Sequence, residues 1–201
     1  MRTKTTNILL VLNLLVLGGI LIRQSVVLQS FAKQSSDQPG TKDDEELIRL
    51  YQEDQSDRKP PAGKSIDWSV VAPRDHARLA RVKELYTQNK LQTGGDYYHA
   101  AMVLQHAEAP EDYLLAHELC VVAISKGNSE AKWLAAASED RFLMNIDRPQ
   151  RFGTQFRTEG ANTPFKLYKM DSGVTDELRR ALNVPSLAEA KAREAKMNKN
   201  K

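Results

Sequence analysis

The sequence contains a single cysteine, Cys120, among its 201 residues. One thiol cannot form an internal disulfide, and it excludes metal sites built from several cysteine ligands. Cys120 lies in the apolar run 119–123, which favours a buried small side chain, because a reactive thiol needs an electropositive and partly exposed setting. The folded part of the chain must therefore be stabilised by packing rather than by cross-links.

The common signatures of cofactor chemistry are also missing. The sequence has no Gly-rich phosphate loop, no dinucleotide fingerprint, no His-Glu-x-x-His zinc helix and no Gly-x-Ser-x-Gly elbow. Of its four histidines, His99 and His106 are seven residues apart, or two helical turns, which places them about 10 Å from each other. One metal ion cannot bridge that distance without further ligands between them. We expect no metal site and no cofactor.

The formal net charge of +3 belongs to the start of the chain. Arg2, Lys4 and Arg23 supply the excess, and the residues after Ala32 carry 26 basic and 26 acidic side chains. A domain without net charge lacks the one-sided electrostatic footprint of a nucleic-acid binder. Nucleic acid is therefore not an expected partner.

The N-terminal segment is predicted to be a signal anchor or a signal peptide, residues 1–32, with an apolar span at about 6–28. Residues 5–22 carry no charge, and the basic residues ahead of them favour an N-in orientation. The prediction is a single-pass cell-membrane protein whose domain lies outside the cytoplasm, in the periplasm or the extracellular space. Secretion after cleavage near Ser30-Phe31-Ala32 is the alternative, but this site lies ten residues beyond Ile22.

The rest of the chain divides into three segments by composition. Residues 33–43 are polar and suit a flexible tether, residues 44–190 have the pattern of a helical domain, and residues 191–201 are predicted to be a basic, frayed tail. Helices are expected from Asp43, Pro73, Asp96, Pro110, Ser129, Thr175 and Ser186. The fold class is therefore all-α, a single helical domain of antiparallel helix hairpins with a long ordered loop, preceded by an N-terminal transmembrane helix.

Several polar side chains stand out of place in this pattern. Gln105 and His106 interrupt an apolar helix, Asp140 and Arg141 close another, and a polar string follows at 150–155. Such groups are costly to bury unless they satisfy one another. If they converge, they form a structural hydrogen-bond network, a binding pocket or a catalytic site. The network is the least costly interpretation, because the long loop after 147 needs side-chain partners for its backbone.

These residues also carry a resemblance. The series Asp-Gln-x-x-Arg, Gln-His, Asp-Arg and Gln-x-Phe-Gly-Thr-Gln resembles an uncharacterised family of bacterial helical domains over about 44–191. The resemblance implies marked positions at Asp54, Gln55, Arg58, Gln105, His106, Asp140, Arg141, Gln150, Gly153, Thr154 and Gln155. The family usually has Tyr where this chain has Phe152, so this ring cannot serve as an acid or a donor. No activity or cofactor is implied.

The first functional hypothesis is a membrane-tethered, extracytoplasmic module that binds a polar small ligand or a partner protein. Arginine and amide side chains would hold the ligand through charge-assisted hydrogen bonds where it is anionic. The predicted ligand-binding residues are Asp54, Gln55, Arg58, Gln105, Arg141, Gln150, Arg151, Gly153, Thr154 and Gln155.

The alternative is a hydrolase-like enzyme with His106 as its general base. Asp140 or Asp54 would orient the imidazole, and Arg141 or Arg151 would stabilise developing negative charge. The predicted catalytic pair is His106 and Asp140. The only hydroxyl within the motif, that of Thr154, is a weak candidate nucleophile because no base is fixed beside it by the sequence.

Overall fold

The computed structural model describes residues 42–160 and 163–199. The predicted signal anchor or signal peptide and most of the predicted tether lie outside these residues. Lys42–Lys201 forms a compact unit that contains both hydrophobic clusters described below, so it has what an independently folding domain needs. Within the described residues, no helix combines the length and apolar character required to cross a bilayer.

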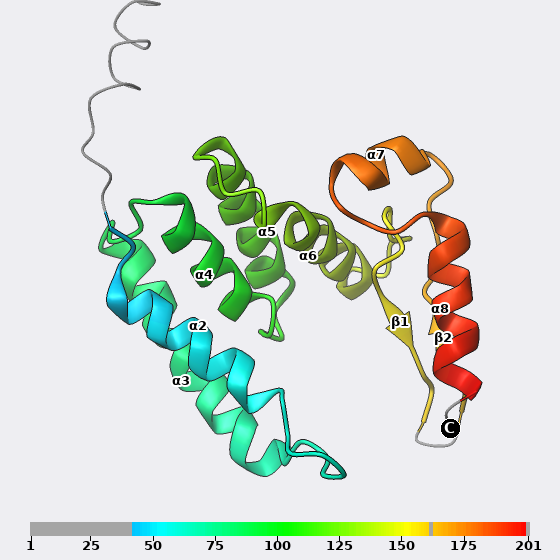
Figure 1. The fold of residues 1–201 in the computed structure, drawn as a ribbon, viewed down its shortest axis with the longest axis horizontal. Helices are drawn as coiled ribbons and strands as arrows, with labels where there is room; N and C mark the ends of the chain where they lie inside the picture. The colour runs from blue at the N-terminus through cyan, green and yellow to red at the C-terminus, as the bar shows by residue number, and fades with distance from the viewer. Residues whose placement is uncertain (1–41, 161–162, 200–201) are drawn as a thin grey trace, which may run out of the picture. The chain divides into compact units, whose positions relative to one another are not determined.

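The described unit is mainly helical, as predicted (Figure 1). Its elements are α2 (Glu45–Asp57), α3 (Trp68–Thr87), α4 (Gly94–Leu104), α5 (Pro110–Ser125), α6 (Ala131–Asn145), β1 (Phe156–Arg157), β2 (Lys166–Leu167), α7 (Asp176–Ala181) and α8 (Leu187–Lys199). The two strands pair antiparallel, Phe156 with Leu167, inside the stretch for which the sequence predicted only a loop.

The helix starts are set by capping side chains, and two of them differ from the prediction. Asp67 caps α3, so this helix begins before Pro73, which lies in its second turn and costs it only one backbone hydrogen bond. Thr93 caps α4 in a reciprocal capping box with Asp96. Gly94 therefore opens a helix instead of ending the preceding region.

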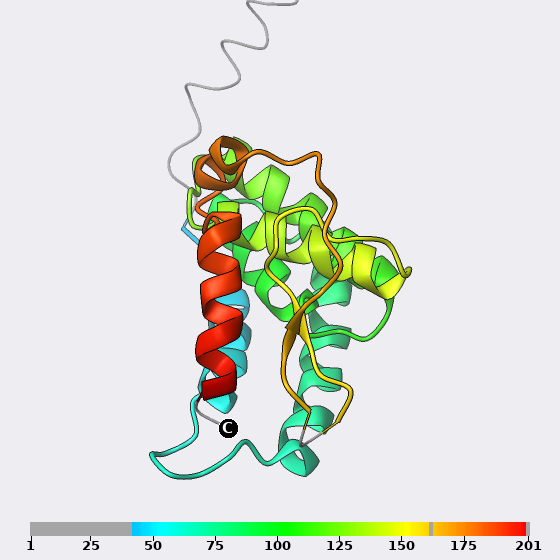
Figure 2. The same ribbon diagram turned by 90° about the vertical axis from the view of Figure 1, so that its right-hand side faces the viewer.

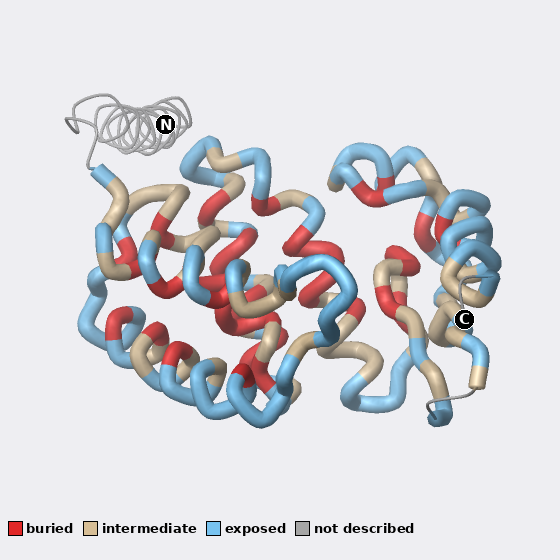
Figure 3. The backbone as a smooth tube through the Cα atoms, turned by 60° about the horizontal axis from the view of Figure 1, so that its bottom comes forward, coloured by how far each residue is buried: buried red, intermediate tan, exposed pale blue. Residues whose placement is uncertain are grey.

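The larger hydrophobic cluster lies between α2, α3, α4, α5 and α6, with buried positions turned toward the interior of the bundle (Figure 3). Small side chains at Ala116, Cys120 and Ala123 let α5 approach α6 closely, and these two helices form the predicted antiparallel hairpin. Cys120 is fully buried, which confirms its interpretation as a packed small side chain, and this burial raises the pKa of its thiol to about 12.

A second, smaller cluster organises the C-terminal part. Phe152, Val174 and Val184 pack there against Ala136 of α6. The short helix α7 begins at the predicted cap Thr175, and Ser186 with Glu189 forms the predicted capping box of α8. The long stretch after α6 is therefore anchored to the bundle through apolar side chains as well as polar ones.

The predicted frayed tail from Lys191 is wrong as far as Lys199, because α8 continues to that residue. Polar side chains of α8 bind the backbone beside β2. Glu194 accepts a hydrogen bond from the Leu167 amide at 2.6 Å, and Asn198 exchanges two with the Phe165 backbone, each 2.8 Å long. The helix and the hairpin consequently lie side by side (Figure 2).

Arg179 is expected to be a structural arginine of this C-terminal part. Its side chain is 3% exposed and donates to the backbone carbonyls of Phe152, Val174 and Arg151. Replacing it with alanine leaves these three carbonyls without their hydrogen-bond donor. Arg179→Ala should therefore lower the free energy of unfolding by about 2–4 kcal/mol in urea titrations. The exposed neighbour Arg180 provides the control, and equal losses in Arg179→Ala and Arg180→Ala would contradict this assignment.

Candidate functional site

The structure brings the predicted site residues together in two groups rather than one. The first, which we call the buried network, joins Asp54, Gln55, Arg58, Gln105, His106 and Arg141 with further residues of α3. The second, the loop cluster, joins Asp140, Gln150, Arg151, Gly153, Thr154 and Gln155. Among the described residues, no hydrogen bond or ion pair connects the two groups.

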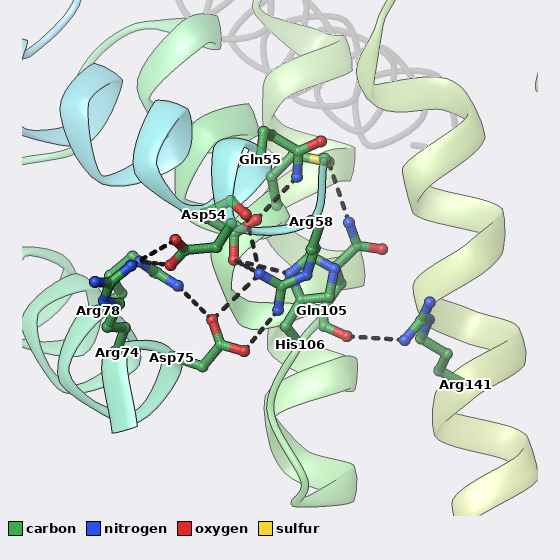
Figure 4. A network of polar contacts seen from close by, with 11 residues as sticks. Asp54, Gln55, Arg58, Arg74, Asp75, Arg78, Gln105, His106 and Arg141 are labelled. Carbon is green, nitrogen blue, oxygen red and sulfur yellow. Dashed lines mark hydrogen bonds and ion pairs between the residues drawn. The ribbon is translucent and has the colours of Figure 1, made fainter. Parts of the chain in front are cut away.

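Asp54 is the centre of the buried network (Figure 4). Its side chain is 1% exposed, and its Oδ1 lies 3.0 Å from His106 Nδ1 and 2.9 Å from Arg58 Nη1. The Gln55 amide donates to Oδ2 at 2.9 Å. Because an ionised carboxylate can only accept a hydrogen bond, its contact with His106 requires the proton of the imidazole to be on Nδ1. Asp54, one of the two carboxylates that the sequence suggested for this role, thus orients His106.

Sequence reasoning missed the part of the network that α3 supplies. Asp75 binds Arg58 at 2.7 Å and Arg78 at 2.6 Å, and Arg78 also binds Asp57 at 2.9 Å. Burial opposes the charge of Asp75, but hydrogen bonds from Arg58 and Arg78 prevail and hold its pKa below the ordinary value. The spacing of Asp75 and Arg78, three residues apart on one helix face, was the available signal.

Arg141 differs from these arginines because it has no carboxylate partner within the part of the chain that the structure describes. Nη1 donates to the backbone carbonyl of Gln105 at 3.1 Å, and Nε is buried without a hydrogen bond. Burial lowers the pKa of Arg141 from its ordinary value, and the charge of Arg58 acts in the same direction. A guanidinium nevertheless stays protonated, so the helix packing leaves a poorly compensated positive charge.

The two ring nitrogens of His106 differ in their surroundings, because Nδ1 contacts Asp54 whereas Nε2 does not. Its side chain is 17% exposed. Nε2 has no hydrogen-bond partner among the described residues, and it is not one of their buried unpaired atoms, so it keeps contact with solvent. The described residues contain no group of His, Cys, Asp and Glu side chains that could hold a metal ion.

Asp140 lies at the centre of the loop cluster and is fully buried. Its Oδ1 accepts from the amides of Arg151 at 2.7 Å and Phe152 at 2.9 Å. Its Oδ2 accepts from the amide and the hydroxyl of Thr154, at 3.0 and 2.8 Å. These four bonds use the acceptor capacity of the carboxylate, so Asp140 does not orient His106. The predicted pairing of the two residues is not formed.

Gln150 holds the other side of the same loop. Its amide nitrogen donates to the carbonyls of Gln155 and Tyr168, both at 3.0 Å, and its amide oxygen accepts from the Gln155 backbone at 2.9 Å. Its own backbone pairs with the segment around Met170. All three functions of the amide are thus used by the loop.

The remaining members of the motif complete the turn between these two anchors. Gly153 has φ +83°, a backbone conformation that favours glycine. The backbone amide of the next residue, Thr154, donates to Asp140. Arg151 pairs with Glu139 at 3.0 Å, and Gln155 donates to the Thr154 hydroxyl at 2.9 Å. This geometry corresponds to the structural-network interpretation of the motif. Ligand binding by these residues stays a prediction.

Comparisons with known proteins add no relative: no protein-family model, curated protein or solved structure matches this chain. The resemblance to an uncharacterised family of bacterial helical domains therefore stays a prediction drawn from its motifs.

The loop cluster should depend on the charge of Asp140. Asp140→Asn replaces one carboxylate oxygen with an NH2 group, which then faces the N–H and O–H donors of the loop and cannot accept from them. The free energy of unfolding should therefore fall by about 2–4 kcal/mol. Glu139→Gln is a matched control on the same helix, because Glu139 makes one ion pair and should lose less than about 1 kcal/mol. Chemical denaturation measures both, and a loss in Asp140→Asn no larger than in the control would disprove the role of Asp140.

Proposed function

We propose that the domain is an extracytoplasmic binding module, held at a membrane by its N-terminal segment, in which Arg141 recognises an anionic group of a polar ligand or partner protein. The observation that carries this proposal is the state of Arg141: a partly buried guanidinium whose only hydrogen bond to the described residues goes to a neutral carbonyl. The uncharged segment 5–22 supports the membrane attachment.

An unpaired, desolvated charge costs stability in the free protein. An anion that reaches Arg141 recovers part of that cost, because charge-assisted hydrogen bonds to a guanidinium are stronger than bonds to a neutral carbonyl. Nη2 is available to such a ligand, since it has no partner among the described residues and is not enclosed. Binding would thus satisfy a residue that folding leaves unsatisfied.

The other arginines near the network are less suited to this role. A groove of about 700 Å³ opens between α2 and α3 and is lined by Arg49, Arg74 and Arg78. Each of these already pairs with a carboxylate, Arg49 with Glu53 and the other two with Asp57. A ligand there would have to displace an existing partner, whereas at Arg141 it would not.

The test measures thermal stability of the Lys42–Lys201 unit with inorganic phosphate, succinate and a short acidic peptide. A bound anion at 100 times its Kd adds about 2.7 kcal/mol, which raises the Tm by several degrees for a unit of this size. We expect a rise for at least one of these anions in the wild-type unit and none in Arg141→Met.

Arg148→Met is the matched control, because Arg148 is exposed and lies just beyond α6. It should respond to the anion as the wild type does. A Tm rise that persists in Arg141→Met, or the absence of any rise in the wild type, would count against recognition at Arg141.

A second candidate, hydrolysis with His106 as general base, rests on the 3.0 Å contact between Asp54 Oδ1 and His106 Nδ1. This distance lies within hydrogen-bond reach, and Nε2 keeps contact with solvent. Thr154 belongs to the loop cluster, where its hydroxyl donates to Asp140. The nucleophile would therefore be water activated at Nε2.

This candidate predicts hydrolysis of an activated ester by the Lys42–Lys201 unit above the background rate. His106→Gln should lower that rate by about 10²–10⁴, the usual contribution of a general base. His76→Gln is the control, since His76 is exposed and lies outside the network contacts. Equal rates in the two variants would exclude His106 as the base.

A further inference from the structure

Charge is distributed unevenly along the described unit, although the whole is close to neutral. Residues 42–147 carry 13 basic and 19 acidic side chains, a formal charge of −6. Residues 148–199, which we call the basic end, carry 11 basic and 6 acidic ones, a formal charge of +5. The balance of the complete chain conceals this separation.

The basic end is also a distinct region of the fold. It contains β1, β2, α7 and α8, which lie on one side of the helical bundle (Figures 1 and 2), and its connecting residues Phe152, Val174 and Val184 form the smaller hydrophobic cluster with Ala136. One charge of α8 lies beside the hairpin, since the Arg193 guanidinium stands 5.4 Å from the centre of the Phe156 ring of β1. The acidic and basic parts of the sequence thus occupy different regions of the folded unit.

A groove of about 410 Å³ runs along the hairpin within the basic end. Arg157, Lys166 and Lys169 line it together with one acidic residue, Glu159. The Arg157 guanidinium and the Lys169 amine each lie 5.5 Å from the centre of the Tyr168 ring. Arg157 and Lys166 form no ion pair with a carboxylate in the described residues. Lys169 is paired with Asp147 at 2.8 Å, so Arg157 and Lys166 are the cations that the groove presents without a carboxylate partner among the described residues.

We propose that the basic end lies against an anionic lipid bilayer and that the hairpin groove receives a headgroup phosphate. The occupant follows from charge complementarity combined with the apolar N-terminal segment, which is predicted to hold the chain at a membrane. Exposed Lys and Arg side chains on α8, at 191, 193, 196 and 199, extend the contact beyond the groove. Each cation near an anionic surface strengthens the attraction about fivefold.

The opposite charge of the helical bundle gives this contact a direction. The acidic part is repelled by the surface that attracts the basic end, so the domain would be oriented as well as bound. This inference is independent of anion recognition at Arg141, which belongs to the acidic part of the unit. Either one can fail without the other.

The experiment uses co-sedimentation of the Lys42–Lys201 unit with vesicles, because this unit lacks the N-terminal segment. Phosphatidylcholine vesicles are compared with vesicles that also contain phosphatidylglycerol, at low ionic strength. We expect binding only to the anionic vesicles, weakened by added salt. The double variant Arg157→Glu/Lys166→Glu should lose about tenfold or more in affinity.

Lys59→Glu/Lys64→Glu is the matched control, because it changes the net charge equally at two exposed lysines between α2 and α3. It should retain the affinity of the wild type within about threefold. Circular dichroism verifies that both variants are folded. Equal losses in the two double variants would overturn the proposal, because binding would then follow net charge alone.

Two further outcomes would also overturn it. Equal binding to neutral vesicles would show that the contact is not electrostatic. Release from anionic vesicles by inorganic phosphate, compared with chloride at the same ionic strength, would assign the groove to free phosphate instead of a bilayer. Retention on the vesicles in phosphate supports the headgroup assignment.

Discussion

The arrangement of the C-terminal part depends on the Asp140 carboxylate. A buried charge is tolerable only when it is compensated, and here three backbone amides and one hydroxyl of the loop supply the compensation. The loop is thereby fixed to the end of α6, and Phe152 enters the smaller hydrophobic cluster. The same arrangement affects the neighbouring residue. Because the carboxylate of Asp140 serves the loop, it does not neutralise Arg141.

The helical fold could be predicted because apolar periodicity and capping residues are local signals. The α5–α6 hairpin, the cap at Thr175 and the capping box at Ser186 all follow from short stretches of sequence. The β-hairpin and the end of α8 could not be predicted in this way. Their stability comes from contacts between distant residues, such as Asn198 with Phe165, for which the local pattern of a basic, polar tail gives no indication.

The site could be predicted as a set of residues but not as an arrangement. The motifs singled out residues that belong to two hydrogen-bonded groups in the structure, whereas the sequence implied one convergence. Asp140 and Arg141 are adjacent, and successive residues point about 100° apart around a helix, so one faces the loop and the other faces Gln105. Asp75 and Arg78 were missed because charged pairs on helices are usually exposed, whereas Arg78 is 5% exposed.

The central claim is that Arg141 is retained for recognition and not for stability. The most direct measurement is the free energy of unfolding of Arg141→Met without any added anion. Methionine preserves most of the packing and removes an uncompensated charge, so the account predicts that stability is unchanged or higher. A loss of more than about 2 kcal/mol would contradict it, because such a loss is typical of a buried residue that the fold itself requires.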